Sequence, residues 1–231
     1  LVVALVTSLI LSFLVTRSPW RGLKLIGALF VVQFGIETVM TQIETLSFND
    51  AVQMENAMLA GIVAAGALRA LIFAPLAVII FGKLRQPPVE DRLPTPPLPP
   101  NWIRRFVALS FFYVLVYFVF GYFVAWQWEA TRVYYTGAAE IKPFFTHITD
   151  LFLREDSVIV PFQLLRGALW TGLALLIVRM MIAKRWQVSL AVALNFSVPR
   201  AVPLILCPNP GMRAAVARSH CGVVRSSMWV C

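Results

Sequence analysis

Apolar runs of about 20 residues recur along this 231-residue chain, and they limit its fold more than any other feature. A helix that crosses a hydrocarbon core of roughly 30 Å needs about 20 predominantly apolar residues. The mean hydropathy is +0.78, and 59% of the residues are hydrophobic whereas 13% are charged. A soluble domain does not cover its surface with so few charged residues. The sequence therefore predicts an all-α, polytopic transmembrane helical bundle.

Six membrane spans are predicted within a transmembrane helical domain over residues 1–207. The chain begins inside an apolar run, and we interpret this run as a first membrane helix whose start is missing. The spans lie near residues 1–16, 23–43, 57–82, 104–127, 159–183 and 187–206. Between them we expect a proline-rich linker at 84–102, which cannot be helical, and a long loop at 128–158.

The connections between the spans alternate in charge. Lysine and arginine gather after the first, third and fifth spans, whereas the connections at 44–56 and 128–158 are rich in acids. The positive-inside rule assigns basic connections to the cytoplasmic side. We therefore expect a multi-pass protein of a bacterial-type cell (inner) membrane, with the proline-rich linker in the cytoplasm. The net charge of +9 follows from this arrangement, and no nucleic-acid partner is expected.

The basic tail at 208–231 breaks the pattern. It contains arginines but no lysine and no acid, and the three cysteines all fall within the last 25 residues of the chain. Such a composition is typical of GC-rich DNA translated out of frame. We therefore expect the true reading frame to be lost after about residue 195, and we base no function on the tail.

Two helical hairpins of the chain resemble each other. The segment "LRALIFAPLA" at 68–77 aligns with "LRGALWTGLA" at 165–174, so that Arg69 aligns with Arg166. The helix before each segment contains Phe-Gly. Because an even number of crossings separates the copies, they would have the same orientation. We predict a parallel repeat of two hairpins, with chance similarity among apolar helices as the alternative.

Arg69 interrupts the third predicted span, and a charge inside an apolar helix requires a partner. Arg69 lies 14 residues before Lys83, and Glu37 lies 13 residues after Lys24. At a rise of 1.5 Å per residue, both side chains lie roughly 20 Å from the basic end of the bundle. We expect Arg69 to face the bundle interior and to form an ion pair with Glu37.

Glu37 belongs to a polar face of its helix. Gln33, Glu37, Thr41 and Glu44 follow one another at spacings of four, four and three residues, which is one side of a helix. A polar face is disfavoured against lipid, so we expect it to pack against the small residues of the next span. These form two rows: Ala57, Gly61 and Ala65, and Gly66, Ala70 and Ala74.

Arg166 is the second charge inside a span, and Gln163 lies on the same helix face. The first helix of its own hairpin contains no acid. Its predicted partners are Glu44 or Glu129 at the outer edge, an aromatic ring, or a bound anion. We interpret Arg166 as a spare cation, which would suit an anionic ligand such as a carboxylate or a lipid phosphate.

Three functions are open for the intramembrane polar cluster, which consists of Gln33, Glu37, Glu44, Arg69, Gln163 and Arg166. Two non-enzymatic functions are favoured together. One is binding or transport of a small anionic or lipid-like molecule; the other is structural, because buried polar groups can fix helix register in a subunit of a membrane complex or a homo-oligomer. The alternative is an intramembrane, hydrolase-like enzyme, in which Glu37 or Glu44 is a base near the outer leaflet and His147 folds over it.

Metal and phosphate sites are not indicated. His147 has no companion at a metal-binding spacing, and neither a Cys-x-x-Cys pair nor a phosphate-binding glycine loop occurs. We therefore expect no cofactor and no metal. The aromatic run at 111–123 is interpreted as lipid-facing bulk.

Overall fold

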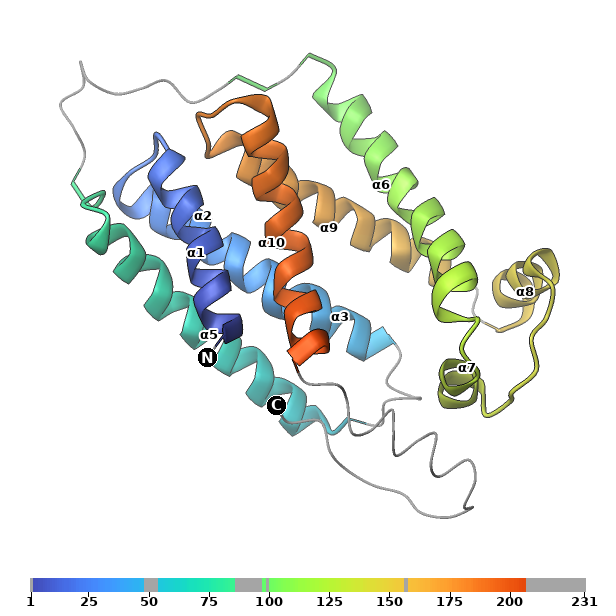
Figure 1. The fold of residues 1–231 in the computed structure, drawn as a ribbon. Coiled ribbons are helices and arrows are strands. Elements are labelled where there is room, and N and C mark those ends of the chain that lie inside the picture. Colours follow the sequence, from blue (N-terminus) through green and yellow to red (C-terminus); the bar gives the residue numbers. More distant parts are fainter. Residues whose placement is uncertain (1, 48–53, 86–96, 99, 156–157, 207–231) are drawn as a thin grey trace.

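The computed structural model describes residues 2–47, 54–85, 97–98, 100–155 and 158–206. Within these ranges the chain forms helices and no strand, which confirms the all-α prediction. The long helices lie side by side in one bundle (Figure 1). The predicted linker lies largely outside the described residues, and the tail at 208–231 lies entirely outside them.

Nine α-helices and three π-helical segments, labelled η, are described. They are α1 (Val2–Arg17), α2 (Gly22–Phe34), η1 (Gly35–Val39), α3 (Met40–Ser47), α5 (Asn56–Ile80), α6 (Trp102–Phe120), η3 (Gly121–Ala125), α7 (Glu129–Thr136), α8 (Phe144–Asp150), η4 (Leu151–Glu155), α9 (Ile159–Arg179) and α10 (Arg185–Leu206).

Four stretches of the described chain are long and apolar enough to cross a membrane, judged by length and composition. They are Gly22–Ser47, Asn56–Ile80, Trp102–Ala125 and Ile159–Arg179. These stretches correspond to the second to fifth predicted spans, and they are consistent with a membrane protein. The count of six is not confirmed. The 16 residues of α1 reach about 24 Å, which is short of a full crossing, and α10 carries Gln187, Asn195 and Arg200.

Two hairpins and one further helix pair build the bundle. Helix α2 packs against α5, α6 packs against α9, and α1 packs against α10. Helix α9 also contacts α2 and α10, so it connects the two hairpins. Figure 1 shows α5 and α6 on opposite sides of the bundle, with the other long helices between them.

A π-helical segment extends the first helix of each hairpin. The segment η1 begins at Gly35 and η3 begins at Gly121, and both glycines follow a phenylalanine. A π-helical turn rotates the side chains that follow it relative to an ordinary α-helix. In the first hairpin this turn contains Glu37. The repeat of the hairpins stays a prediction.

The hydrophobic core lies where α1, α2, α5, α9 and α10 meet. Its fully buried side chains include Leu14, Leu25, Leu29, Val32, Ile36, Met40, Val78, Ile177 and Met180. Helix α6 lies outside this core and exposes Phe111, Phe112 and Leu115. It approaches α9 at Gly167, where a Cβ atom would lie 2.6 Å from the carbonyl oxygen of Ser110. The close approach of α6 to α9 therefore depends on this glycine.

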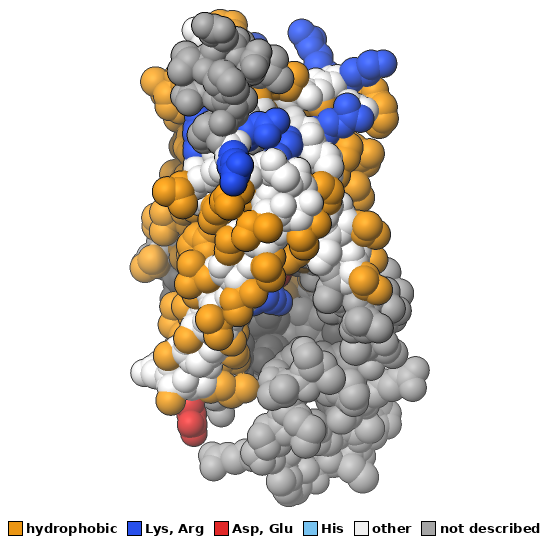
Figure 2. Space-filling model, turned by 90° about the vertical axis from the view of Figure 1, so that its left-hand side faces the viewer, with side chains coloured by type: hydrophobic (Ala, Val, Ile, Leu, Met, Phe, Trp, Pro, Cys, Tyr) orange, Lys and Arg blue, Asp and Glu red, His pale blue; other side chains and the backbone are white. Residues whose placement is uncertain are grey.

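Basic residues gather at one end of the bundle, as Figure 2 shows, with an acidic side chain at the other end. At the basic end, the turn between α1 and α2 bonds to both hairpins. Gly22 donates its N–H to the carbonyl of Lys83 at 2.8 Å, and Ile182 donates its N–H to the carbonyl of Arg17 at 2.9 Å. The Lys83 ammonium donates to two further carbonyls of the first helix and this turn. These bonds bring three basic connections of the chain together.

Candidate functional site

Glu37 and Arg69 form an ion pair between the π-helical segment η1 and α5. Glu37 Oε2 lies 2.5 Å from Arg69 Nη2, so the ion pair predicted from helix depth is present. The two side chains differ in burial: Glu37 is 11% exposed, whereas Arg69 is 56% exposed. The expectation that Arg69 faces the bundle interior is therefore wrong.

Arg69 is exposed because α5 turns a different row of small residues toward α2. Ala70 and Ala74 are fully buried, whereas Gly61 and Ala65 are exposed. Arg69 continues the exposed row at a spacing of four residues. Its stem therefore starts from the outer surface of α5, and its guanidinium reaches back to the acid. Only one of the two predicted rows is buried in the bundle.

Arg166 lies deep in the second hairpin, where its side chain is 3% exposed, and Glu44 of α3 supplies its acid. Arg166 Nη1 and Nη2 donate to the two carboxylate oxygens of Glu44 at 3.3 and 2.8 Å. Arg166 Nη1 also donates to Gln163 Oε1 at 3.1 Å. Such a bidentate fork is a strong form of charged hydrogen bond. The interpretation of Arg166 as a spare cation is wrong, because Glu44 neutralises it.

Aromatic rings complete the surroundings of this guanidinium. Its central carbon lies 5.8 Å from the ring centres of Tyr117 in α6 and Phe162 in α9. Of the partners predicted for Arg166, the described structure therefore contains Glu44 and aromatic rings. Within the described part of the chain, no hydrogen bond or ion pair joins the Glu37–Arg69 pair to the Arg166 group.

Two hydrogen-bond donors of the Arg166 group have no partner among the described residues. They are Arg166 Nε and Gln163 Nε2, and the Gln163 side chain is 0% exposed. A buried donor without a partner costs about 1–3 kcal/mol. In the first hairpin, Gln33 is also buried, and its Oε1 has no partner in the part of the chain that is described. Arg166 differs from Gln33 because its side chain also lines a cavity.

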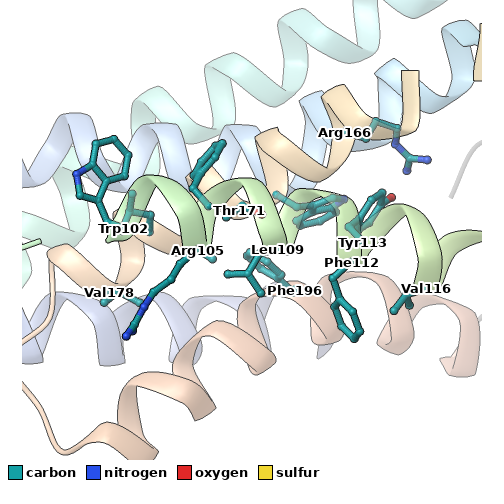
Figure 3. Close-up of a pocket in the computed structure, with 14 residues that line it drawn as sticks. Trp102, Arg105, Leu109, Phe112, Tyr113, Val116, Arg166, Thr171, Val178 and Phe196 are labelled. Carbon is teal, nitrogen blue, oxygen red and sulfur yellow. The ribbon is translucent and has the colours of Figure 1, made fainter. Parts of the chain in front are cut away.

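A groove of about 620 Å³ runs between α6, α9 and α10, and Arg166 lines it. Figure 3 shows Trp102, Arg105 and Val178 toward one end of the groove, and Arg166 and Val116 toward the other. Its remaining lining is mostly apolar: Phe106, Leu109, Phe112, Tyr113, Trp170, Thr171, Ala174, Leu175 and Phe196. This volume falls within the roughly 300–1,000 Å³ of typical ligand pockets.

The residues of α6 that line the groove were not predicted, because the aromatic run at 111–123 was interpreted as lipid-facing bulk. Leu109, Phe112, Tyr113 and Val116 lie at i, i+3, i+4 and i+7. That spacing is one helical face and is the signal present in the sequence. The other faces of α6 are equally apolar, so the pattern alone does not select this face.

His147 of α8 lies in an aromatic cluster. Its ring centre is 5.6 Å from that of Tyr122 and 4.9 Å from that of Trp126. The predicted approach of His147 to Glu44 stays a prediction. Among the described residues, no group of three or more histidine, cysteine or acidic side chains is arranged to hold a metal ion.

Comparisons with protein-family models, with curated proteins and with solved structures found no match to this chain. The geometry of the groove and of the two ion pairs is therefore the basis for a function.

Proposed function

We propose that this chain is a multi-pass membrane protein that binds a lipid-like molecule in the groove between α6, α9 and α10. One observation carries the proposal: a long groove lined by apolar side chains ends at a buried arginine. Apolar walls favour a hydrocarbon chain, because burial contributes roughly 25 cal/mol for each Å² removed from water. Polar groups at one end of an apolar pocket fix the orientation of its ligand.

The groove follows α6, which is the direction that a lipid chain takes in a bilayer. Arg105 and Val116, near its two ends, are 11 residues apart, which corresponds to about 16 Å of helix. Arg105 lies at the basic end, and the positive-inside rule assigns that end to the cytoplasmic surface. In this proposal the groove begins near the cytoplasmic surface and ends at Arg166, inside the membrane.

Binding is favoured over the intramembrane enzyme because both candidate acids already have arginine partners. Both carboxylate oxygens of Glu44 accept hydrogen bonds from Arg166, and Glu37 is paired with Arg69. Both carboxylates are therefore already occupied by arginine partners. The groove supplies apolar walls with an arginine toward each end, which suit binding.

Filling the groove tests the proposal. Ala174→Phe introduces a bulky ring into the lining, whereas Ala64→Phe introduces the same ring on the exposed surface of α5. The probe is a decyl chain that carries bromine atoms, which quench the fluorescence of nearby tryptophans such as Trp170. With purified protein in detergent, we expect saturable quenching that weakens about tenfold or more in Ala174→Phe, while Ala64→Phe behaves as the wild type. Equal quenching in all three proteins would contradict a binding groove.

A second candidate function is that of a subunit in a membrane complex, and the exposed row of α5 favours it. Gly61 and Ala65 are exposed on the side that leads to Arg69, and a Cβ atom at Gly61 would meet nothing within 4 Å. Small residues at this spacing let another membrane helix approach closely. A neighbouring helix would also cover the open side of Arg69.

Gly61→Leu tests this second candidate. We expect it to remove any larger species seen by analytical ultracentrifugation in detergent. Gly27→Leu is the matched control, because Gly27 of α2 is also exposed and also has open space around it. A protein that remains one size with or without Gly61→Leu would argue against a complex built through this face.

A further inference from the structure

We infer that the groove binds an amphiphile with an anionic head, and that Arg105, rather than Arg166, holds this head. The ligand class is an apolar chain that carries one carboxylate or phosphate, as in a fatty acid or a phosphate-headed lipid. This inference rests on the proposed function, narrows its ligand and states which way the ligand lies in the groove.

The two arginines of the groove lining differ in what they offer to an anion. Arg166 is 3% exposed, and both carboxylate oxygens of Glu44 already accept hydrogen bonds from it. Arg105 is exposed, and no hydrogen bond or ion pair joins its guanidinium to another described residue. A carboxylate or phosphate can accept two parallel hydrogen bonds from such a guanidinium. Arg105 is therefore the arginine that suits an anionic head.

The surroundings of Arg105 are positive. Arg104 precedes it, and the first turn of α6 contains no acid and is not capped by a side chain. The N-terminus of a helix carries a partial positive charge, which adds to that of the two arginines. Trp102 also lines the groove at this end (Figure 3), and tryptophan favours the headgroup level of a membrane. This end of the groove therefore combines positive charge with a side chain suited to the membrane surface.

The depth of the two ends supports the same orientation. Arg105 lies at the basic end of the bundle, where a charged head stays close to water, whereas Arg166 lies inside the membrane in the proposed function. A charged group inside hydrocarbon is costly unless it finds a partner, and Arg166 is already paired with Glu44. The head of an amphiphile is therefore expected at Arg105, with its chain directed toward Arg166.

The lining beyond Arg105 suits a single apolar chain. Leu109, Phe112 and Val116 continue from Arg105 along one side of α6. Trp170 lines the groove on α9, and it lies one helical turn from Arg166. A chain whose head is held at Arg105 therefore extends toward Trp170. This prediction gives the orientation a fluorescent reporter.

The first experiment compares probes that share a decyl chain and differ in the charge of the head. They are undecanoate, decyl phosphate, decanol and decyltrimethylammonium, each competing with the brominated decyl probe for wild-type protein in a non-ionic detergent. We expect the tighter of the two anions to bind about three- to tenfold more tightly than decanol, the effect of one partly exposed charge pair. We expect the cation to bind more weakly than decanol. The tighter anion identifies a carboxylate or a phosphate as the preferred head.

The second experiment removes one charge from the groove. We expect Arg105→Gln to abolish the preference for anionic heads while decanol still binds. Arg104→Gln is the matched control, because Arg104 is the exposed neighbour of Arg105 and does not line the groove. Both variants lose the same charge from the same end of the bundle, so general attraction of anions changes equally. We expect Arg104→Gln to keep most of the wild-type preference.

The third experiment measures the orientation of the chain. The probe is undecanoate with one bromine on the carbon farthest from the carboxylate, and quenching is compared in the wild type, Trp170→Phe and Trp102→Phe. With the head at Arg105 the bromine lies near Trp170, so Trp170→Phe should remove more of the quenching than Trp102→Phe. A larger loss in Trp102→Phe would place the head at the Arg166 end and would overturn the inference.

The outcomes separate the inference from the proposed function. If decanol binds saturably, is blocked by Ala174→Phe and is as tight as both anions, the inference is wrong and the groove still binds lipid-like chains. An equal loss of anion preference in Arg104→Gln and Arg105→Gln would also overturn the inference, because the attraction would then belong to the whole basic end. If no probe binds saturably, both the inference and the proposed function fail.

Discussion

Each hairpin contains an arginine that is bonded to an acid of the first hairpin, but the two ion pairs bury opposite members. In the first hairpin the acid Glu37 is 11% exposed and the cation Arg69 is 56% exposed. In the second pair, which joins Arg166 of the second hairpin to Glu44 of the first, the cation is 3% exposed and the acid is 38% exposed. The same pairing of residue types therefore creates a buried carboxylate in one place and a buried guanidinium in the other.

This difference determines what each pair offers to other molecules. The first pair presents its cation at the surface of α5, where a helix of another chain would meet it. The second pair keeps its cation inside, beside a groove that is open to a small molecule. It also determines which substitution is worst, because the cost of breaking an ion pair depends on the charge that stays buried.

The largest effect is expected at the second pair. Glu44→Ala leaves the buried Arg166 guanidinium without an acid, and we expect it to lower the free energy of unfolding by about 3–5 kcal/mol. Arg166→Gln removes the buried charge and leaves Glu44 partly exposed, so its cost should be smaller. Unfolding in detergent followed by circular dichroism measures both. A larger loss for Arg166→Gln than for Glu44→Ala would contradict the assignment of the buried partner.

The next-largest effect is expected at the glycines where the helices of each hairpin approach each other closely. A Cβ atom at Gly167 would lie 2.6 Å from the Ser110 carbonyl oxygen, which is backbone and cannot move away, so Gly167→Ala should cost about 1–3 kcal/mol. A Cβ atom at Gly66 would instead meet the side chain of Thr38. Adding Thr38→Ala should therefore recover most of the stability lost in Gly66→Ala. Thermal unfolding of the single and double variants measures the recovery, and no recovery would show that the first hairpin is also held at its backbone.

At the first pair we expect the opposite order, in which removing the arginine costs more stability than removing the acid. Arg69→Gln leaves the mostly buried Glu37 carboxylate unpaired, and we expect a loss of about 1–2 kcal/mol. Glu37→Gln leaves an exposed guanidinium and should cost about 1 kcal/mol or less. The double variant should be less destabilised than the sum of the two. Additive losses in this double-mutant cycle would show that the two side chains do not interact in the folded protein.

The first pair could be predicted from sequence, and the second could not be predicted completely. Glu37 and Arg69 lie on helices that follow each other in the chain, so counting residues from a shared end was enough to match their depths. Glu44 and Arg166 are 122 residues apart and meet only because α3 contacts α9. No local pattern selects that contact, so Glu44 remained one of several partners.

Burial was harder to predict than pairing. Helix α5 has two rows of small residues, and either row could have packed against α2; the structure buries the row of Ala70 and exposes the row that continues to Arg69. The groove has the same origin, because α6 is apolar on all sides and only its contact with α9, at Gly167, decides which face remains open beside Arg166. Helix type and charge distribution follow from sequence, whereas the rotation of each helix about its axis depends on its neighbours.

The smallest effect concerns how each hairpin is attached at the basic end. The second hairpin bonds to Arg17 through the backbone N–H of Ile182, which does not titrate. The first hairpin bonds through the Lys83 ammonium to the carbonyls of Thr16 and Ser18. Burial, and then the nearby positive charge of Arg21, lower the pKa of Lys83 from its usual value of 10.5. Folding therefore disfavours the charged form of Lys83.

The sign of the pH dependence follows from that lowered pKa. Between the lowered pKa and 10.5, the unfolded chain binds more protons at Lys83 than the folded chain does, so stability rises with pH in this window. Below the lowered pKa this gain is absent. Other lysines and tyrosines titrate in the same range, so we expect the wild type to gain slightly more stability than Lys83→Met as the pH is raised toward 10.5. Unfolding curves for the two proteins at several alkaline pH values measure this difference, and an equal gain in both would show that the Lys83 ammonium is as well solvated in the folded protein as in the unfolded chain.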